Sequence, residues 1–264
     1  MQDLKITFIQ SDLVWKNHEA NLLAFEEKIL QTKIATDLII LPEMFNTGFV
    51  VEPQTIDEFA AKLGLAWMQK MAKVKNAVIT GSMIIKKNDK YYNRLYWVLP
   101  NASYKTYDKR HLFSLGNEHL RFTAGEKQLI VTLKGWKIKP LVCYDLRFPV
   151  WAKNKYVSGT YEYDVLIYLA NWPAARSHAW KSLLVARAIE NQAYVVGVNR
   201  VGKDGNGTPH SGNSGVIEPK GEWISEEVIN QDSVQDIVLS ANDMNAYRNK
   251  FTVGLDWDEF NIKI

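Results

Sequence analysis

The chain has 264 residues, a formal net charge of +3 and 47% hydrophobic residues. A chain of this length can bury a large core without disulfides or a structural metal. The single cysteine excludes an internal disulfide and every CxxC-type metal or redox site. Basic residues form no long run, so no nucleic-acid partner is expected. No basic leader precedes the first apolar segment and no apolar stretch is long enough to cross a bilayer, so we expect a cytoplasmic chain without a membrane partner.

The first part of the chain alternates strand and helix patterns. Residues 4–10 are rich in β-forming residues, and residues 17–30 carry apolar side chains at helical spacing. Residues 38–41 form a continuous apolar run that Pro42 ends, which favours a strand covered on both faces. This strand–helix–strand opening predicts a layered α/β architecture. A second helix and a three-stranded meander are then expected at 59–71, 77–85, 91–99 and 104–109.

The second part of the chain continues the same alternation. Further strands are predicted at 136–143, 164–170, 193–199 and 235–239, and helices at 180–192 and 243–251. A loop is expected over 202–211 and a hairpin with arms 215–218 and 221–224. No Pro/Gly/Ser-rich linker, charge block or internal repeat divides the chain. We therefore expect residues 1–264 to form a single domain.

Several common site motifs are missing from the sequence. The chain has no GxxxxGK[ST] phosphate loop and no GxSxG nucleophile elbow. Its five histidines show no HExxH spacing, and each is interpreted as a surface or hydrogen-bonded residue. The sequence thus predicts neither a metal site nor an organic cofactor.

Cys143 and Glu43 both follow predicted strands. Cys143 ends the strand at 136–143, and Pro149 stands where a helix can begin. Backbone N–H groups at such a strand end can bind an oxyanion or lower the pKa of a thiol. Glu43 follows the apolar run 38–41, at the rim where ligand sites form in α/β folds. Each residue alone also fits an ordinary structural role, an inert buried cysteine and a solvated carboxylate.

Lys109 follows the strand predicted at 104–109. A cation at this place can stabilise a tetrahedral oxyanion and favour a thiolate. Glu118, in the loop that follows, could hold this lysine by an ion pair. Taken singly, Lys109 is ordinarily a solvated strand-end lysine and Glu118 a surface carboxylate of a loop.

The three residues together lie in blocks that resemble the signature motifs of the nitrilase superfamily, in the same order. The blocks are Leu41-Pro42-Glu43-Met44-Phe45, Tyr107-Asp108-Lys109-Arg110-His111-Leu112-Phe113 and Leu141-Val142-Cys143-Tyr144-Asp145-Leu146-Arg147-Phe148-Pro149. The resemblance covers essentially the whole chain. It implies an αββα sandwich, a homodimer, and a catalytic Glu43–Lys109–Cys143 triad with Glu118 as auxiliary glutamate. Relatives that hydrolyse true nitriles typically have Trp where this chain has Tyr144, which favours amidase chemistry.

Within the superfamily the chain is most similar to the omega-amidases that act on 2-oxoglutaramate. Three further segments carry this likeness, namely 171–176, 186–194 and 199–202. The expected substrates are the monoamides of 2-oxo dicarboxylic acids, 2-oxoglutaramate and 2-oxosuccinamate. We expect the backbone N–H of Tyr144 to bind the oxyanion and Arg176 to bind the substrate carboxylate. Phe49 and Trp172 are expected to form apolar walls. Arg176 also fits a surface position, and the two aromatic residues also fit core packing. Alternative functions are another carbon–nitrogen hydrolase, such as a carbamoyl-amino-acid hydrolase, or a non-enzymatic interaction module.

Overall fold

A mixed β-sheet forms the first layer of strands. In the computed structural model, which describes residues 1–32 and 35–264, its strand order is β15-β1-β2-β3-β4-β5. The parallel strands are β1 (Leu4–Gln10), β2 (Leu38–Ile40) and β3 (Val78–Lys87). The antiparallel strands are β4 (Lys90–Val98), β5 (Tyr104–Asp108) and β15 (Ser233–Leu239). Helices α1 (His18–Gln31) and α2 (Ala60–Lys75) connect the three parallel strands.

A second mixed sheet has the strand order β14-β11-β10-β7-β6. Its parallel strands are β7 (Trp136–Val142), β10 (Val165–Leu169) and β11 (Tyr194–Val198). The antiparallel edge strands are β6 (Val131–Leu133) and β14 (Gly215–Ile217). Helix α4 (Ser177–Asn191) connects β10 to β11. The smaller elements are α3 (Pro149–Ala152), the β-pair β8 (Tyr156–Val157) and β9 (Thr160–Tyr161), the β-pair β12 (Val201–Lys203) and β13 (Pro209–Ser211), and α5 (Ala241–Lys250).

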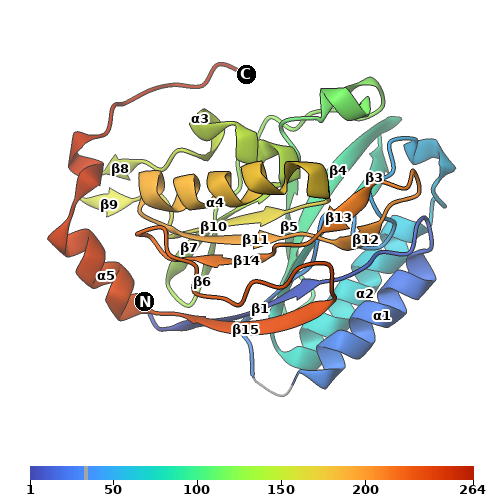
Figure 1. Cartoon of the computed structure of the whole chain (residues 1–264), viewed down its shortest axis with the longest axis horizontal. Coiled ribbons are helices and arrows are strands. Elements are labelled where there is room, and N and C mark those ends of the chain that lie inside the picture. The colour runs from blue at the N-terminus through green and yellow to red at the C-terminus, as the bar shows by residue number, and fades with distance from the viewer. Residues whose placement is uncertain (33–34) are drawn as a thin grey trace.

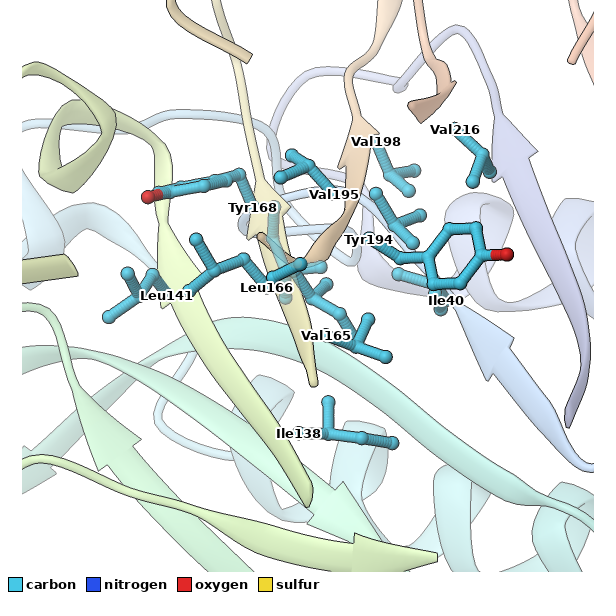
Figure 2. Close-up of a cluster of buried hydrophobic side chains, with 14 of the residues drawn as sticks. Ile40, Ile138, Leu141, Val165, Leu166, Tyr168, Tyr194, Val195, Val198 and Val216 are labelled. Atoms are coloured by element: carbon cyan, nitrogen blue, oxygen red, sulfur yellow. The ribbon is translucent and has the colours of Figure 1, made fainter. Parts of the chain in front are cut away.

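The two sheets pack face to face between outer layers of helices (Figure 1). Successive side chains of a strand point to opposite faces. In β2, Leu38 and Ile40 accordingly join the core between the sheets, whereas Ile39 joins the cluster beneath α1 and α2. Figure 2 shows Ile40 beside side chains from β7, β10 and β11 of the other sheet. Both faces of β2 are therefore buried, as its continuous apolar sequence predicts.

Helix α4 covers the outer face of the second sheet. Its Trp180 and Leu184 are fully buried and lie over Gly197 of β11. A Cβ at Gly197 would lie 2.6 Å from one Leu184 methyl group and 2.8 Å from the Trp180 ring, so only glycine permits this close approach. The αββα sandwich expected from the sequence is thus confirmed.

Most predicted elements are present with shifted ends, and two predictions are wrong. Residues 221–224 form no strand, because Trp223 makes only an isolated bridge to Ile217. The loop expected over 202–211 contains most of the β12–β13 pair. The three-residue strand β6 was not predicted, and α4 begins at Ser177 rather than residue 180. Short strands and helix ends carry too few periodic positions for a sequence pattern to locate them.

Within residues 1–32 and 35–264, no helix is long and apolar enough to cross a membrane.

Candidate active site

One edge of the sandwich gathers the ends of several strands. The parallel strands β2, β7 and β10 end just before Glu43, Cys143 and Asn171, respectively. The antiparallel strand β5 ends just before Lys109. The carboxyl ends of parallel strands share one edge of a sheet, where ligands bind in open α/β folds. Glu43, Lys109, Cys143 and Asn171 here line one cavity of about 320 Å³.

Lys109 forms the centre of a buried charge cluster. Its side chain is 1% exposed, and those of Glu43 and Glu118 are 0% exposed. Lys109 Nζ donates to Glu43 Oε1 at 3.0 Å and to Glu118 Oε2 and Oε1 at 2.9 and 3.1 Å. One cation therefore faces two buried carboxylates, and the cluster keeps a net negative charge when both are ionised. The structure thus brings Glu43 beside Lys109 and Glu118, although Glu43 lies 66 residues before Lys109 in the sequence.

Backbone and amide donors fix the two carboxylates. Glu43 Oε2 accepts the backbone N–H of Asn171 at 2.8 Å, and Glu43 Oε1 accepts the side-chain amide of Asn93 at 2.7 Å. Glu118 Oε2 accepts the backbone N–H of Phe113 at 2.6 Å. Glu43 therefore has donors from β4, from Lys109 after β5 and from the segment after β10, which determine its orientation.

The charge cluster shifts the acidity of its members. Burial lowers the pKa of Lys109, but the nearby Glu118 and Glu43 carboxylates outweigh this effect and raise it overall. Burial, together with the neighbouring Glu43, raises the pKa of Glu118, and Lys109 only partly opposes that rise. Lys109 is accordingly a permanent cation at neutral pH, and it remains available as an electrostatic partner for developing negative charge.

Cys143 stands where β7 turns into a short 3₁₀ segment, η4 (Cys143–Arg147). Its backbone φ is +45°, a left-handed conformation that costs a non-glycine residue about 1–3 kcal/mol. Such strain is typical of residues whose side chain must face a site. Burial raises the pKa of the Cys143 thiol, the Glu43 carboxylate adds to that rise, and Lys109 opposes it. The thiol is therefore protonated at rest, so its use as a nucleophile requires a base to take its proton.

Asp145 joins the segment that carries Cys143 to the one that carries Lys109. Its buried carboxylate accepts the backbone N–H of Val142 at 3.0 Å, the backbone N–H of His111 at 3.0 Å and the hydroxyl of Tyr107 at 2.7 Å. These three hydrogen bonds tie the end of β7 and the start of η4 to β5 and the loop that follows β5.

Aromatic side chains and two arginines form the walls of the cavity. Phe49, Tyr144 and Trp172 line it. Arg176 also lines it, with its guanidinium 5.2 Å from the centre of the Phe113 ring. Arg147 is a second guanidinium in the cavity, 5.0 Å from the Trp172 ring. The cavity lining therefore carries two guanidinium groups besides the buried Lys109.

His210 lines the same cavity from β13. It is 4% exposed, and its Nδ1 lies 3.0 Å from the carbonyl oxygen of Thr208, which fits the hydrogen-bonded state expected from the sequence. Burial and the nearby Arg200 lower the pKa of His210 to about 4, so the imidazole is neutral at neutral pH.

Sequence reasoning missed Asn93, Asn171 and Arg147 as members of this site. Asn171 and Arg147 lie inside segments already compared with the superfamily, but nothing in their spacing marked a function. Asn93 lies in the middle of β4 and reaches Glu43 only because β4 pairs with β3 and β5.

Comparisons with known proteins decide the family. A family model described as carbon-nitrogen hydrolase matches residues 5–249. The chain belongs to this family. The hydrolase is 45% identical over 262 residues to the omega-amidase YafV of Escherichia coli K12, covering 99% of the chain and 100% of that relative. It is 34% identical to the 2-oxoglutaramate amidase of Bacillus subtilis over 226 residues, 84% of the chain and 85% of the relative.

Solved structures agree with this family assignment. The carbon–nitrogen hydrolase superposes with a TM-score of 0.93 on XC1258 from Xanthomonas campestris, a CN-hydrolase superfamily protein, at 39% identity and with 100% of both chains covered. Yeast Nit3, a member of the nitrilase superfamily, gives a TM-score of 0.81 at 22% identity over 95% and 94% of the two chains and shares the fold. The resemblance to the nitrilase superfamily found in the sequence is thus confirmed.

Proposed function

We propose that this carbon–nitrogen hydrolase is an omega-amidase. It cleaves the terminal amide of 2-oxo dicarboxylic acid monoamides, such as 2-oxoglutaramate and 2-oxosuccinamate, to the 2-oxo acid and ammonia. The observation that carries the proposal is the cavity that combines a thiol, a buried carboxylate–lysine cluster and two guanidinium groups. The 45% sequence identity to YafV over 99% of the chain supports the same reaction and substrate class.

The first half of the reaction uses Cys143 as nucleophile and Glu43 as base. The Cys143 sulfur forms a bond to the amide carbonyl carbon while its proton passes to Glu43. Negative charge develops on the carbonyl oxygen, where Lys109 Nζ and the backbone N–H of Tyr144 stabilise it. Tyr144 is the second residue of η4, and the first N–H groups of such a segment have no acceptor inside it. The carbon–nitrogen bond then breaks, and Glu43 gives its proton to the departing ammonia.

The second half releases the acid. A water molecule transfers a proton to Glu43 as its oxygen attacks the thioester carbon, and the oxyanion is again held by Lys109. The carbon–sulfur bond breaks, and the thiolate of Cys143 recovers a proton from Glu43. Atoms and charges balance without a cofactor. Glu118 keeps Lys109 aimed through its two oxygens.

The guanidinium groups select the substrate. The end of a 2-oxo monoamide remote from its amide is a carboxylate, and the planar fork of arginine binds carboxylates through two hydrogen bonds. Arg176 is the proposed ligand, and Arg147 faces the same cavity as a second cation. Phe49 and Trp172 enclose the chain of the substrate between the two ends.

We also propose that residues 1–264 act as one catalytic domain within a homodimer. The match of the family model over residues 5–249 supports a single domain. The homodimer rests on the resemblance of the sequence to the nitrilase superfamily.

A substrate panel tests the proposed function. Ammonia and carbon dioxide are measured for 2-oxoglutaramate, plain neutral amides and carbamoyl amino acids. The omega-amidase releases ammonia alone, with a kcat/KM for 2-oxoglutaramate at least about tenfold above that of a neutral amide of similar length. Preferential turnover of carbamoyl acids with release of both gases would instead establish a carbamoyl-amino-acid hydrolase.

A further inference from the structure

Asn93 is an uncharged, fully buried residue that contacts every charged member of the cluster. Its side-chain amide nitrogen lies 2.7 Å from Glu43 Oε1 and 3.5 Å from Glu118 Oε1. The backbone N–H of Lys109 donates to the Asn93 carbonyl oxygen at 2.9 Å. One residue in the middle of β4 is thus linked to Lys109 and to both carboxylates.

The nitrogen of the Asn93 side-chain amide has hydrogen-bond partners, whereas its oxygen has none among the described residues. Ionised carboxylates only accept hydrogen bonds, so the NH₂ group must face Glu43 and Glu118, and the oxygen must face away. Among the residues that the structure describes, no group donates to the buried Asn93 Oδ1. A buried acceptor without a partner lowers stability, and an apolar side chain of similar size would avoid that cost. Stability alone therefore does not account for an amide here, whereas its contact with Glu43 does.

We propose that Asn93 is a positioning residue for the general base Glu43. Its amide holds Glu43 in the ionised state, oriented toward Lys109, and supplies a neutral donor between two carboxylates that would otherwise repel each other. The inference rests on the role proposed above for Glu43. A second cation at this place would neutralise both carboxylates and oppose proton uptake by Glu43, whereas an amide adds no net charge.

The groups around Glu43 determine what loss of this amide does. Glu43 faces the cation Lys109, the second carboxylate Glu118, the thiol of Cys143 and the backbone N–H of Asn171. Removing one of its donors weakens the ionised carboxylate more than the neutral acid, so a smaller share of Glu43 can accept the Cys143 proton. Proton transfer from Cys143 to Glu43 then fails at a higher pH.

Alkylation of Cys143 by iodoacetamide measures this effect without any substrate. The chain has one cysteine, so the extent of labelling reports on Cys143 alone. In Asn93→Leu, the pH at which alkylation falls off on the acid side moves upward by about 1–2 units, as expected for loss of a hydrogen bond to a charged group. Asn93→Asp keeps the size of the side chain, replaces the donor by an acceptor and shifts the profile in the same direction.

Asn191→Leu is the matched control. Asn191 is also fully buried, and its amide bonds to the Arg187 carbonyl oxygen and to the Asn154 backbone N–H, outside the cavity. This variant loses thermal stability but keeps the wild-type alkylation profile. A wild-type profile in folded Asn93→Leu and Asn93→Asp would overturn the proposal. Failure of the omega-amidase assignment would be distinct, because it appears as wild-type enzyme that does not turn over 2-oxoglutaramate.

Discussion

Replacement of Lys109 by methionine removes the cation that binds both Glu43 and Glu118. Methionine keeps much of the side-chain volume, so packing changes little. Lys109 Nζ makes three contacts of 2.9–3.1 Å with Glu43 and Glu118. Removing one partner of a buried ion pair costs about 3–5 kcal/mol of stability, because the other charge stays buried without compensation.

The same substitution also removes the proposed oxyanion donor. Loss of one such donor lowers kcat by a factor of about 10²–10³. We expect Lys109→Met to show at least this loss in 2-oxoglutaramate hydrolysis, and a smaller change in KM, because the interaction forms fully only in the transition state.

The stability defect of Lys109→Met depends on pH with a definite sign. Burial and Glu43 already raise the pKa of Glu118, and Lys109 opposes that rise. Without the lysine, the pKa of Glu118 in the folded protein rises further above its unfolded value. A group with a raised folded pKa stabilises the protein at low pH and loses this contribution as pH increases. The destabilisation is therefore larger at about pH 8 than at about pH 5.5.

Two assays check these expectations. Thermal unfolding of the variant and the wild type across this pH range measures the stability difference, and ammonia release measures turnover. A normal rate with reduced stability would refute the oxyanion role and leave Lys109 as a structural residue. A stability difference that does not vary with pH would refute the view that one cation compensates two carboxylates.

The remaining predictions concern substrate selection, the nucleophile and assembly. Arg176→Ala should weaken kcat/KM for 2-oxoglutaramate by about 1.5–3 kcal/mol, or about ten- to more than a hundredfold, and leave a small neutral amide nearly unaffected; equal losses on both substrates would show a structural role. Arg147→Ala should have a smaller effect, because this side chain is more exposed and its charge is better screened. Cys143→Ser should lose several orders of magnitude in turnover, because an alkoxide forms much less readily than a thiolate, and near-normal turnover would contradict covalent catalysis. Light scattering should give the mass of a dimer, whereas a monomer mass at all working concentrations would refute the homodimer.

Features that depend on local sequence could be predicted. The apolar run before Pro42 indicated a doubly covered strand because each of its residues is buried on one face or the other. The same pattern placed Glu43 at a strand end. Cys143 and Lys109 followed from the ends of two other strands, and their motifs indicated a shared site.

Features that depend on packing between distant segments could not be predicted. Asn93 lies between Tyr92 and Arg94 in a strand whose sequence is not unusual. Its amide contacts Glu43 only after β3 and β4 pair. His210 reaches the cavity because β12 and β13 fold back over it, in a segment expected to be a loop. Such contacts have no periodic or motif signal in the sequence.

The protonation state of the thiol was also beyond the sequence. Strand-end N–H groups and Lys109 suggested a lowered thiol pKa, but burial and the Glu43 carboxylate outweigh them. The balance of these opposing effects depends on how deeply the sulfur lies in the fold. A protonated thiol supports the proposed role of Glu43 as the base that takes the Cys143 proton.

Trapping of the covalent intermediate tests the central claim most directly. The enzyme is mixed with 2-oxoglutaramate, quenched with acid during turnover and digested, and the peptide that contains Cys143 is examined by mass spectrometry. The account predicts an acyl adduct of the 2-oxo acid on Cys143 that is absent from Cys143→Ala and disappears when substrate is exhausted. Turnover of 2-oxoglutaramate by Cys143→Ala at a near-normal rate, or an adduct on another residue, would contradict it.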